Sequence, residues 1–438
     1  MFWVAPFPAA PGETPSLNLG NGLVVHTSQG QVAFDGKGGA IIGSLVADSA
    51  CMGFPPGGSL HLRDNGARVT SQEGGFPGMG TSTIQTQVTR STGWGRWAEY
   101  RLTEFRGESQ AMAAEVLAGL SQSPKSVPPK YFYDAEGSRL FDQICRLPEY
   151  YLTRAETSIL EKYAGALPKL FGRGLCLIEF GSGDCRKGRF VLETGAVDTF
   201  VPVDISTECL CSAARQVAAD YPFVAVHAVA MDFQSDMTSL DALLSGTGRR
   251  IILYAGSSIG NLTPPEAHRL LSQFAELLGE GGALLIGYDL KKDAGILQRA
   301  YDDAQGVTAA FNLNLLARLN RELKADFDLE SYRHVALYDQ VLGRIEMHLE
   351  SLVAQEVTIA NQHVQLEAHE RIHTENSYKY SVAQFDAMAY AAGFDPSCVW
   401  LDPTASFALG AYTTRPRNIA PRRIPAAAKV RLLGNLPF

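Results

Sequence analysis

Three short polar stretches, each at the end of an apolar run, have the residue types that bind a nucleoside. The turn "GSG" that begins at Gly181 follows "LCLIEF", and its glycines leave the backbone open to a ligand. Asp204 ends the next apolar run, where a carboxylate can accept hydrogen bonds from both ribose hydroxyls. Asp232 and Phe233 follow the third run, so that a carboxylate can bind an adenine amino group while a ring lies against the base.

The turn lacks the residues that known phosphate-binding loops require. A dinucleotide fingerprint needs a third glycine where Arg186 stands, and the Walker pattern is absent. The three features in chain order therefore favour an adenosine without a required phosphate, and S-adenosylmethionine fits. The alternative is an α/β protein whose strand ends carry aspartates by chance. Lys187 could pair with the methionine carboxylate, or it could be a solvated helix lysine.

Strand-like and helix-like segments alternate around these residues. Apolar runs between Leu175 and about Asp289 are separated by segments of helix length, which predicts a parallel sheet with crossover helices. The helix "TPPEAHRLLSQFAELLGEGG" has clear ends, because Thr263 can serve as its N-cap and Glu266 can close a capping box.

Segments further along the chain extend this pattern. Residues 108–122, residues 293–325 and "SVAQFDAMAYAAGF" are typical of helices, and residues 334–380 are typical of strands. We therefore expect an α/β fold, in which a doubly wound, Rossmann-like domain is interrupted by a smaller α+β domain.

The composition excludes several classes of protein. The chain has 438 residues, of which 46% are hydrophobic, so it can form a large core and two or more domains. A net charge of -8 argues against nucleic acid or an anionic membrane as the main partner. The sequence has no membrane-length apolar run, and "MFWVAPFPAAPG" lacks the features of a signal peptide. The cysteines are scattered, with only Cys209 and Cys211 close together, which indicates a reduced, cytoplasmic protein.

The histidines form no recognisable metal-ligand motif. His369 and His373 are at positions i and i+4, but they lie in strand-like sequence, where that spacing does not form a helical zinc pair. We therefore expect no bound metal.

Both ends of the chain differ from the rest. The first hundred residues hold 18 of the 42 glycines and have no helical period, although "VVHTSQGQVAFDG" could form a hairpin. We expect residues 1–105 to be a disordered extension, or to reflect a start codon assigned too far upstream, with Met112 as an alternative start. Residues 415–438 form a second, basic and proline-containing tail, which we expect to be solvated.

Beyond these local features, the sequence resembles the histidine-specific, S-adenosylmethionine-dependent methyltransferases of ergothioneine biosynthesis. The resemblance covers about residues 108–414. It rests on the strings "PKSVPPKYFYDAEGSRLFDQICRLPEYYLTRAE", "EFGSGDCRKGRF", "GSSIGNLTPPEA", "YDDAQGVTAAFNLNLLARLNRELKADFD" and "HTENSYKYS". It implies a cofactor domain, residues 155–291 and 380–414, and a substrate-binding domain, residues 106–154 and 292–379.

In the cofactor domain, the resemblance implies a set of residues that contact S-adenosylmethionine. They are Gly181, Lys187, Asp204, Asp232 and Phe233.

In the substrate-binding domain and beside it, the resemblance implies a pocket for an amino acid. Tyr150, Asn261 and Tyr301 correspond to residues that hold its main-chain end, and Tyr133 and Phe141 to the pocket wall. An asparagine amide can donate to a carboxylate and accept from an amine, although from sequence alone Asn261 is equally an ordinary turn residue. Asn261 and Tyr133 are the candidate catalytic residues, which we expect to orient the α-nitrogen.

Glu375 and Ser377 correspond to the family's imidazole-binding pair. Residues i and i+2 of a strand face the same side, so the carboxylate can accept from one ring N–H while the hydroxyl serves the other nitrogen. Without the resemblance, the pair would be read as the solvated face of a strand. Met347 corresponds to a residue beside the imidazole, and these three residues together favour histidine over an indole or an apolar side chain.

Four residues depart from the pattern of actinobacterial members. Asn376, Tyr378, Tyr288 and His348 stand where Val, Cys, Thr and Trp occur in those proteins. None of the departures removes a matched residue, and Tyr288, His348 and Asn376 bear on the fine choice of substrate.

The resemblance implies three successive methyl transfers to the α-nitrogen of L-histidine, giving the trimethylated betaine hercynine, by a monomer without nucleic acid or membrane partners. Within the same chemistry, the alternative substrates are another amino acid such as a thiohistidine or tryptophan. A protein of another class, a non-catalytic S-adenosylmethionine-binding partner, is the remaining alternative.

Overall fold

The apolar run before the glycine turn forms β10 (Leu175–Phe180), a fully buried strand of a large mixed sheet. This computed structural model describes residues 100–105, 112–234 and 237–416 with their side chains, and several strands before Tyr100 and the start of the helix at Ser109 by their backbone alone. The strands that surround β10 are β11 (Val197–Asp204), β12 (Ala225–Ala230), β13 (Arg249–Tyr254), β14 (Ala283–Asp289), β20 (Phe394–Leu401) and β21 (Phe407–Thr414).

The strand order identifies a doubly wound sheet. The strands lie in the order β12-β11-β10-β13-β14-β21-β20, and the first five pair in parallel. β21 runs antiparallel to both β14 and β20. The chain leaves β10 for β11 on one side, whereas β13 lies on the other, so the order reverses beside β10. In such sheets ligands bind in the crevice at this switch point, at the carboxyl ends of the strands. The predicted Rossmann-like α/β fold is confirmed.

Alternate residues of β10 face two different cores. Leu175 and Leu177 pack in one hydrophobic core, and Ile178 and Phe180 pack in the other. The first core contains α4 (Leu152–Tyr163), η3 (Ala164–Ala166), α5 (Leu167–Phe171), α6 (Arg186–Leu192) and α7 (Thr207–Asp220); the second contains α8 (Met237–Leu243), α9 (Pro264–Leu278) and α12 (Val382–Ala391). Burial on both faces explains why every residue of the strand except Glu179 is apolar.

The helix signals in the sequence correspond to real ends. α9 begins after Thr263, and Thr263 and Glu266 form the predicted capping box. α12 begins with a second box, made by Ser381 and Gln384. Residues 293–325 contain two helices, α10 (Ala294–Tyr301) and α11 (Val307–Leu323), as expected.

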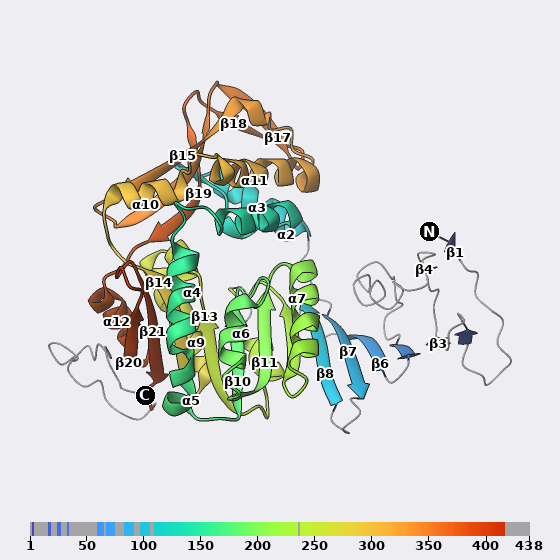
Figure 1. Ribbon diagram of the computed structural model, residues 1–438. Helices are drawn as coiled ribbons and strands as arrows, with labels where there is room; N and C mark the ends of the chain where they lie inside the picture. Colours follow the sequence, from blue (N-terminus) through green and yellow to red (C-terminus); the bar gives the residue numbers. More distant parts are fainter. Residues whose placement is uncertain are drawn as a thin grey trace.

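A smaller, four-stranded sheet lies beyond the carboxyl ends of the large sheet (Figure 1). Its strands, in spatial order, are β15 (Tyr332–Asp339), β16 (Arg344–Ser351), β19 (Arg371–Tyr378) and β9 (Lys125–Ser126). The hairpin β17 (Gln355–Ile359) and β18 (Gln362–Leu366) and the helices α2 (Ser109–Leu120), η2 (Pro129–Phe132), α3 (Ala135–Ile144) and η5 (Leu329–Ser331) accompany it. Phe311 and Leu315 of α11 pack in one core with Leu349 of β16 and Ile372 of β19, so this sheet is covered by α11.

The large sheet also extends beyond β12, which corrects the expected boundary at residue 105. Residues 100–105 end strand β8 (Trp97–Phe105), which pairs in parallel with β12. Tyr100 and Leu102 are buried, and Thr103 Oγ1 lies 2.9 Å from Nε2 of His227 on β12. An extension without order is therefore wrong for these residues, because they fill the core beside α7.

The strands before β8 are described only by how their backbones pair. β7 (Thr83–Ser91), β6 (Ala67–Gly74) and β5 (Ser59–Asp64) continue the sheet outward. β3 (Val24–Thr27) pairs with β2 (Ser16–Asn18) and β5, whereas β4 (Ala33–Phe34) pairs with β1 (Phe2–Trp3), so the predicted hairpin is wrong. The remaining calls on the first hundred residues and on residues 417–438 lie outside the described residues.

Among the helices that the structure describes, none combines the length and apolar character needed to cross a bilayer.

Tyr288, one of the departures from the family pattern, lies in the core below α12. It is fully buried, and its ring stacks on Phe385 with centroids 4.0 Å apart and planes at 6°. Tyr288 therefore fills the second hydrophobic core.

We expect Phe385→Ala to lower the free energy of unfolding by about 3–5 kcal/mol, because it removes a fully buried ring and leaves Tyr288 without its stacking partner. Urea denaturation measures the change. Val341→Ala is the control, since Val341 is 94% exposed and the truncation should cost less than about 0.5 kcal/mol. A loss below about 1 kcal/mol for Phe385→Ala would contradict this packing.

Candidate active site

The glycine turn after β10 is open to a ligand. Gly181 and Gly183 have φ angles of 65° and 49°, in the left-handed region that glycine adopts without strain. A Cβ atom built on either residue would have no heavy atom within 4 Å, so space lies in front of both. The turn is held from behind, because the backbone N–H of Gly181 donates to the carbonyl of Val203 at 2.8 Å.

Asp204 stands beside this turn with its carboxylate fixed by the backbone. Its Oδ2 accepts from the N–H of Gly183 at 2.8 Å, and its Oδ1 accepts from the N–H of Ser206 at 2.9 Å. Burial raises the pKa of Asp204 above its ordinary value, and these backbone hydrogen bonds offset part of the rise. Each oxygen keeps a second lone pair, so the carboxylate can still accept hydroxyl donors.

Lys187 makes a contact that the sequence did not indicate. Its Nζ lies 2.5 Å from Oε2 of Glu156, a fully buried carboxylate at the middle of α4. Glu156 also accepts from the N–H of Gly256 at 2.9 Å. A Cβ on Gly287 would lie 2.0 Å from Oε1 of Glu156, so the carboxylate occupies the space that this glycine leaves. The lysine is therefore a positioned cation near the turn, rather than a freely solvated one.

Glu179, the last residue but one of β10, is a second buried carboxylate below the turn. Its Oε1 accepts from the N–H of Gly188 at 3.0 Å, and its Oε2 has no hydrogen-bond partner among the described residues. Burial raises the pKa of Glu179 to about 8, while Lys187 lowers it to a lesser degree. The sequence analysis did not single out this residue, because it reads as part of an apolar run.

Asp232 and Phe233 lie after β12, as predicted, but Asp232 already has a cationic partner. Lys130 of η2 donates to Oδ2 of Asp232 at 2.9 Å and also lies 2.8 Å from Oε2 of Glu115 on α2. The Phe233 ring lies beside Phe180, with centroids 5.0 Å apart. The ion pair of Lys130 and Asp232 connects the segment before α3 to the large sheet.

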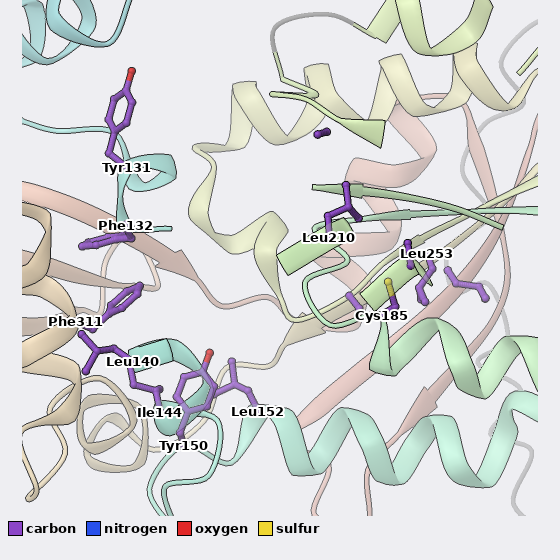
Figure 2. Close-up of a cluster of buried hydrophobic side chains, with 14 of the residues drawn as sticks. Tyr131, Phe132, Leu140, Ile144, Tyr150, Leu152, Cys185, Leu210, Leu253 and Phe311 are labelled. Atoms are coloured by element: carbon purple, nitrogen blue, oxygen red, sulfur yellow. The ribbon is translucent and has the colours of Figure 1, made fainter. Parts of the chain in front are cut away.

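Aromatic rings from three segments form the wall of a second site. The ring centroid of Tyr133 lies 5.7 Å from Phe141 and 5.9 Å from Phe311, and that of Tyr150 lies 6.0 Å from Tyr301. Figure 2 shows Phe311 together with Phe132 and, next to them, Leu140, Ile144 and Tyr150. The sequence analysis expected Tyr133 and Phe141 at a pocket wall and Tyr150 and Tyr301 at the main-chain end of the substrate. It did not single out Phe311, which reads as an apolar residue of the amphipathic helix α11.

The four-stranded sheet contributes the polar side of this site. Met347 on β16 is directly opposite Glu375 on β19, and Ile345 is opposite Ser377, so the four side chains share one face of the sheet. The Glu375 carboxylate is buried and has no hydrogen-bond partner within the described residues. Burial raises the pKa of Glu375 to about 7, and the charge of Lys379 partly offsets the rise.

Ser377 and Tyr301 are in contact with each other and with Lys379. The two hydroxyl oxygens lie 2.7 Å apart, and the Nζ of Lys379 donates to Ser377 Oγ at 2.8 Å and to Tyr301 Oη at 3.0 Å. Lys379 also pairs with Asp289 at the end of β14, 2.9 Å from its Oδ2. The structure therefore joins Tyr301 to Ser377, which the sequence analysis had assigned to opposite ends of a substrate.

Asn261 ends the short helix η4 (Ser258–Asn261), which packs on β19. A Cβ on the preceding Gly260 would lie 2.9 Å from the carbonyl oxygen of Tyr378 and 3.5 Å from Ser377 Oγ, so glycine permits this close approach. The Asn261 amide is half-buried and makes no hydrogen bond within the described residues. Its donor and acceptor are therefore available beside the pocket.

Tyr133 is affected by the charges of both sites. Burial raises its pKa well above the ordinary value, and the carboxylates of Glu375 and Asp204 both add to this rise. Glu375 belongs to the polar face of the small sheet and Asp204 to the glycine turn.

The other three departures from the family pattern lie on the reverse face of the small sheet. Asn376 and Tyr378 alternate with Glu375 and Ser377 along β19, so their side chains point the other way. Their side chains make hydrogen bonds to neighbours on this face: Asn376 to His373, Tyr378 to Arg344, and His348 to Glu346. These residues form a polar cluster outside the pocket.

We expect Glu375→Gln to change the stability of the ligand-free protein in a pH-dependent way. The folded-state pKa of about 7 exceeds the ordinary value of 4.5, so the folded chain binds more protons between these values and stability falls as pH rises through them. The variant should be more stable than the wild type by about 3 kcal/mol at pH 8, and by little near pH 4. Urea denaturation across this range is the measurement, with Glu280→Gln on the exposed surface as the control. A difference that does not vary with pH would refute the shifted pKa.

Comparison with known proteins identifies the family. A family model described as "Histidine-specific methyltransferase, SAM-dependent" matches residues 112–414. The histidine N-alpha-methyltransferase of Mycolicibacterium smegmatis is 43% identical over 307 residues, which cover 69% of this chain and 94% of that protein. The protein of the same name from Mycobacterium tuberculosis is 41% identical and covers 68% of this chain and 94% of its own.

A longer fungal protein is also similar. Ergothioneine biosynthesis protein 1 of Neurospora crassa is 31% identical over 288 residues, which cover 63% of this chain and 32% of that protein. The family match spans more than half of the chain and includes both the glycine turn and the aromatic pocket. The chain belongs to the family of histidine-specific, S-adenosylmethionine-dependent methyltransferases.

Proposed function

We propose that this protein transfers methyl groups from S-adenosylmethionine to the α-nitrogen of L-histidine, in three successive steps, within ergothioneine biosynthesis. The names of the bacterial and fungal relatives support the reaction and the pathway. One observation carries the choice of substrate: Glu375, without a partner, and Ser377 share a buried face with Met347. A carboxylate and a hydroxyl side by side suit an imidazole, which has one N–H donor and one acceptor nitrogen.

The aromatic wall supports an amino acid of this size. Tyr133, Phe141 and Phe311 pack against one another, as do Tyr150 and Tyr301, and Tyr301 contacts Ser377 of the sheet. We assign the main-chain end of histidine to Tyr150, Tyr301 and Asn261. Asn261 suits this role because its amide has no protein partner, and it can donate to the carboxylate and accept from the amine. Tyr133 would orient the α-nitrogen toward the cofactor side.

The residues at the glycine turn fit S-adenosylmethionine. The cofactor supplies an electrophilic methyl group on its sulfonium. Gly181 and Gly183 leave open backbone for it, Asp204 offers lone pairs to the ribose, and Lys187 offers a cation to the methionine carboxylate. Asp232 and Phe233 are assigned to the adenine, with Lys130 close to the same carboxylate.

The domain division follows from these assignments. We propose that the four-stranded unit is the substrate-binding domain and the doubly wound sheet is the cofactor domain, each with the boundaries expected from the sequence, except that β8 joins the second. We propose a monomer, as the resemblance implies. The cysteines described here are free thiols, which supports a cytoplasmic location.

The proposal is tested by incubating the purified protein with L-histidine and S-adenosylmethionine and following the products by mass spectrometry. We expect stepwise gains of one, two and three methyl groups, and none when the α-amine is blocked. A thiohistidine and tryptophan are run in parallel. Faster methylation of either one than of histidine would overturn the substrate assignment, and a product that stops at one methyl group would overturn trimethylation.

Two variants separate the two sites and serve as controls for each other. We expect Glu375→Ala to raise the KM for histidine at least tenfold with an unchanged Kd for S-adenosylmethionine, because it removes a buried acceptor. Asp204→Ala should raise the cofactor Kd at least tenfold, because it removes the predicted ribose acceptor. Calorimetry and steady-state kinetics give both numbers. Equal effects of one variant on both ligands would contradict the separation.

A further inference from the structure

Lys379 is a fully buried lysine that the family resemblance did not assign a role. It follows β19 directly, and its side chain is 0% exposed. Its Nζ is within hydrogen-bond distance of three oxygens: Ser377 Oγ at 2.8 Å, Tyr301 Oη at 3.0 Å and Asp289 Oδ2 at 2.9 Å. An ammonium group has three N–H donors and no acceptor, so these contacts use all of them.

The partners of Lys379 keep it charged and in place. Burial by itself would lower the pKa of Lys379, but Asp289 and Tyr301 more than offset this and hold it above its ordinary value. Asp289 is itself fixed, because Tyr151 donates to its Oδ2 at 2.7 Å and Lys292 pairs with its Oδ1 at 2.5 Å. The lysine therefore cannot move toward another acceptor without leaving Asp289 with one cation fewer.

Two of the three donors of Lys379 decide how the two pocket hydroxyls can behave. Each hydroxyl has one proton, and both Ser377 and Tyr301 already accept from the lysine. Their oxygens lie 2.7 Å apart, so one hydroxyl donates to the other. One proton of the pair is used in this bond, which leaves a single proton to be directed at a ligand.

The positive charge of Lys379 also favours a neutral ligand over a cationic one. A cationic imidazole would carry a second N–H toward Ser377, which already accepts from an ammonium, and would place two positive charges close together. A neutral imidazole instead donates to Glu375 and offers its other nitrogen as an acceptor for the remaining proton of the pair.

We propose that Lys379 is a positioning residue for substrate recognition: it donates to both Ser377 and Tyr301, so the hydroxyl that also accepts from its neighbour has no free lone pair, can only donate to a ligand, and thereby selects the neutral imidazole of histidine. The inference rests on the proposed function, whose histidine pocket it deepens. Lys379 acts on the substrate through the two hydroxyls and is not itself assigned a contact with the ligand.

The test is a double-mutant cycle of Lys379→Met and Ser377→Ala, with histidine KM, kcat and the Kd for S-adenosylmethionine measured for each variant. We expect Lys379→Met to raise the histidine KM about 10- to 100-fold, the range for hydrogen bonds to a charged group, and to change the cofactor Kd less than twofold. The double variant should be no more than about threefold worse than Ser377→Ala, because the lysine acts through the Ser377 and Tyr301 pair and Ser377→Ala already breaks that pair. Lys169→Met is the matched control, since Lys169 is exposed on α5, away from the site.

Three results would overturn the inference. The first is a histidine KM within twofold of wild type in folded Lys379→Met. The second is a double variant whose fold-increase in histidine KM equals the product of the two single-variant increases. The third is an equal loss of histidine and cofactor binding in Lys379→Met. If Lys379→Met does not fold, the same measurements are made on Lys379→Met/Asp289→Asn. In this variant residue 289 is a neutral amide, so no buried carboxylate is left without the charge of Lys379. A wild-type protein that does not methylate histidine would instead refute the proposed function, so the two failures are distinct.

Discussion

The ion pair between Lys379 and Asp289 is the contact on which the arrangement of the two sheets depends. Both side chains are fully buried, and two charges removed from water are stable only when their remaining hydrogen-bonding groups are also satisfied. Asp289 ends strand β14 of the large sheet, and Lys379 follows β19 of the small sheet. The requirement to satisfy both groups therefore fixes where the small sheet meets the large one.

A continuous chain of contacts leads from this ion pair to the cofactor side. The N–H of Asp289 donates to Ser257 Oγ at 3.0 Å, and the N–H of the adjacent Gly256 donates to Glu156, which holds Lys187. The residues that follow β13 thus touch both the network of the substrate pocket and the carboxylate behind the glycine turn. In the proposed assignment, these buried groups would set the distance between the two ligands, and a near-contact approach of reacting atoms demands such rigidity.

The sequence predicted those parts of the fold and site that have local signals. The apolar run at β10, the turn at Gly181 and the capping box at Thr263 are recognisable because each depends on neighbouring residues. Glu156 and Lys379 were not recognisable, since their partners lie far away in the chain and only folding brings them together. A buried glutamate at the middle of an amphipathic helix reads as surface until the strand that covers it is known.

The departures from the family pattern show the value and the limit of strand periodicity. Asn376 and Tyr378 alternate with Glu375 and Ser377, so period two alone places them outside the pocket. His348 follows Met347 on β16, so the same alternation places it on the reverse face. Period two could not show which residue of β19 lies opposite His348, because the register shifts between Met347 and His348. The extra residue is Thr374 on β19, and no local pattern in "RIHTENSY" marks it.

The strand β8 has a consequence for how the protein behaves in concentrated solution. The family match begins at residue 112, and β12 is the outermost strand of the sheet within that match. An outermost strand presents unpaired N–H and C=O groups along its free side, which is where sheets of separate molecules join. β8 occupies that side of β12 and buries Tyr100 and Leu102 there. A chain beginning at Met112 would keep every residue assigned to the two ligands, but it would expose the edge of β12 to pairing with other molecules. The strand β8 therefore affects the tendency of the protein to aggregate rather than its chemistry.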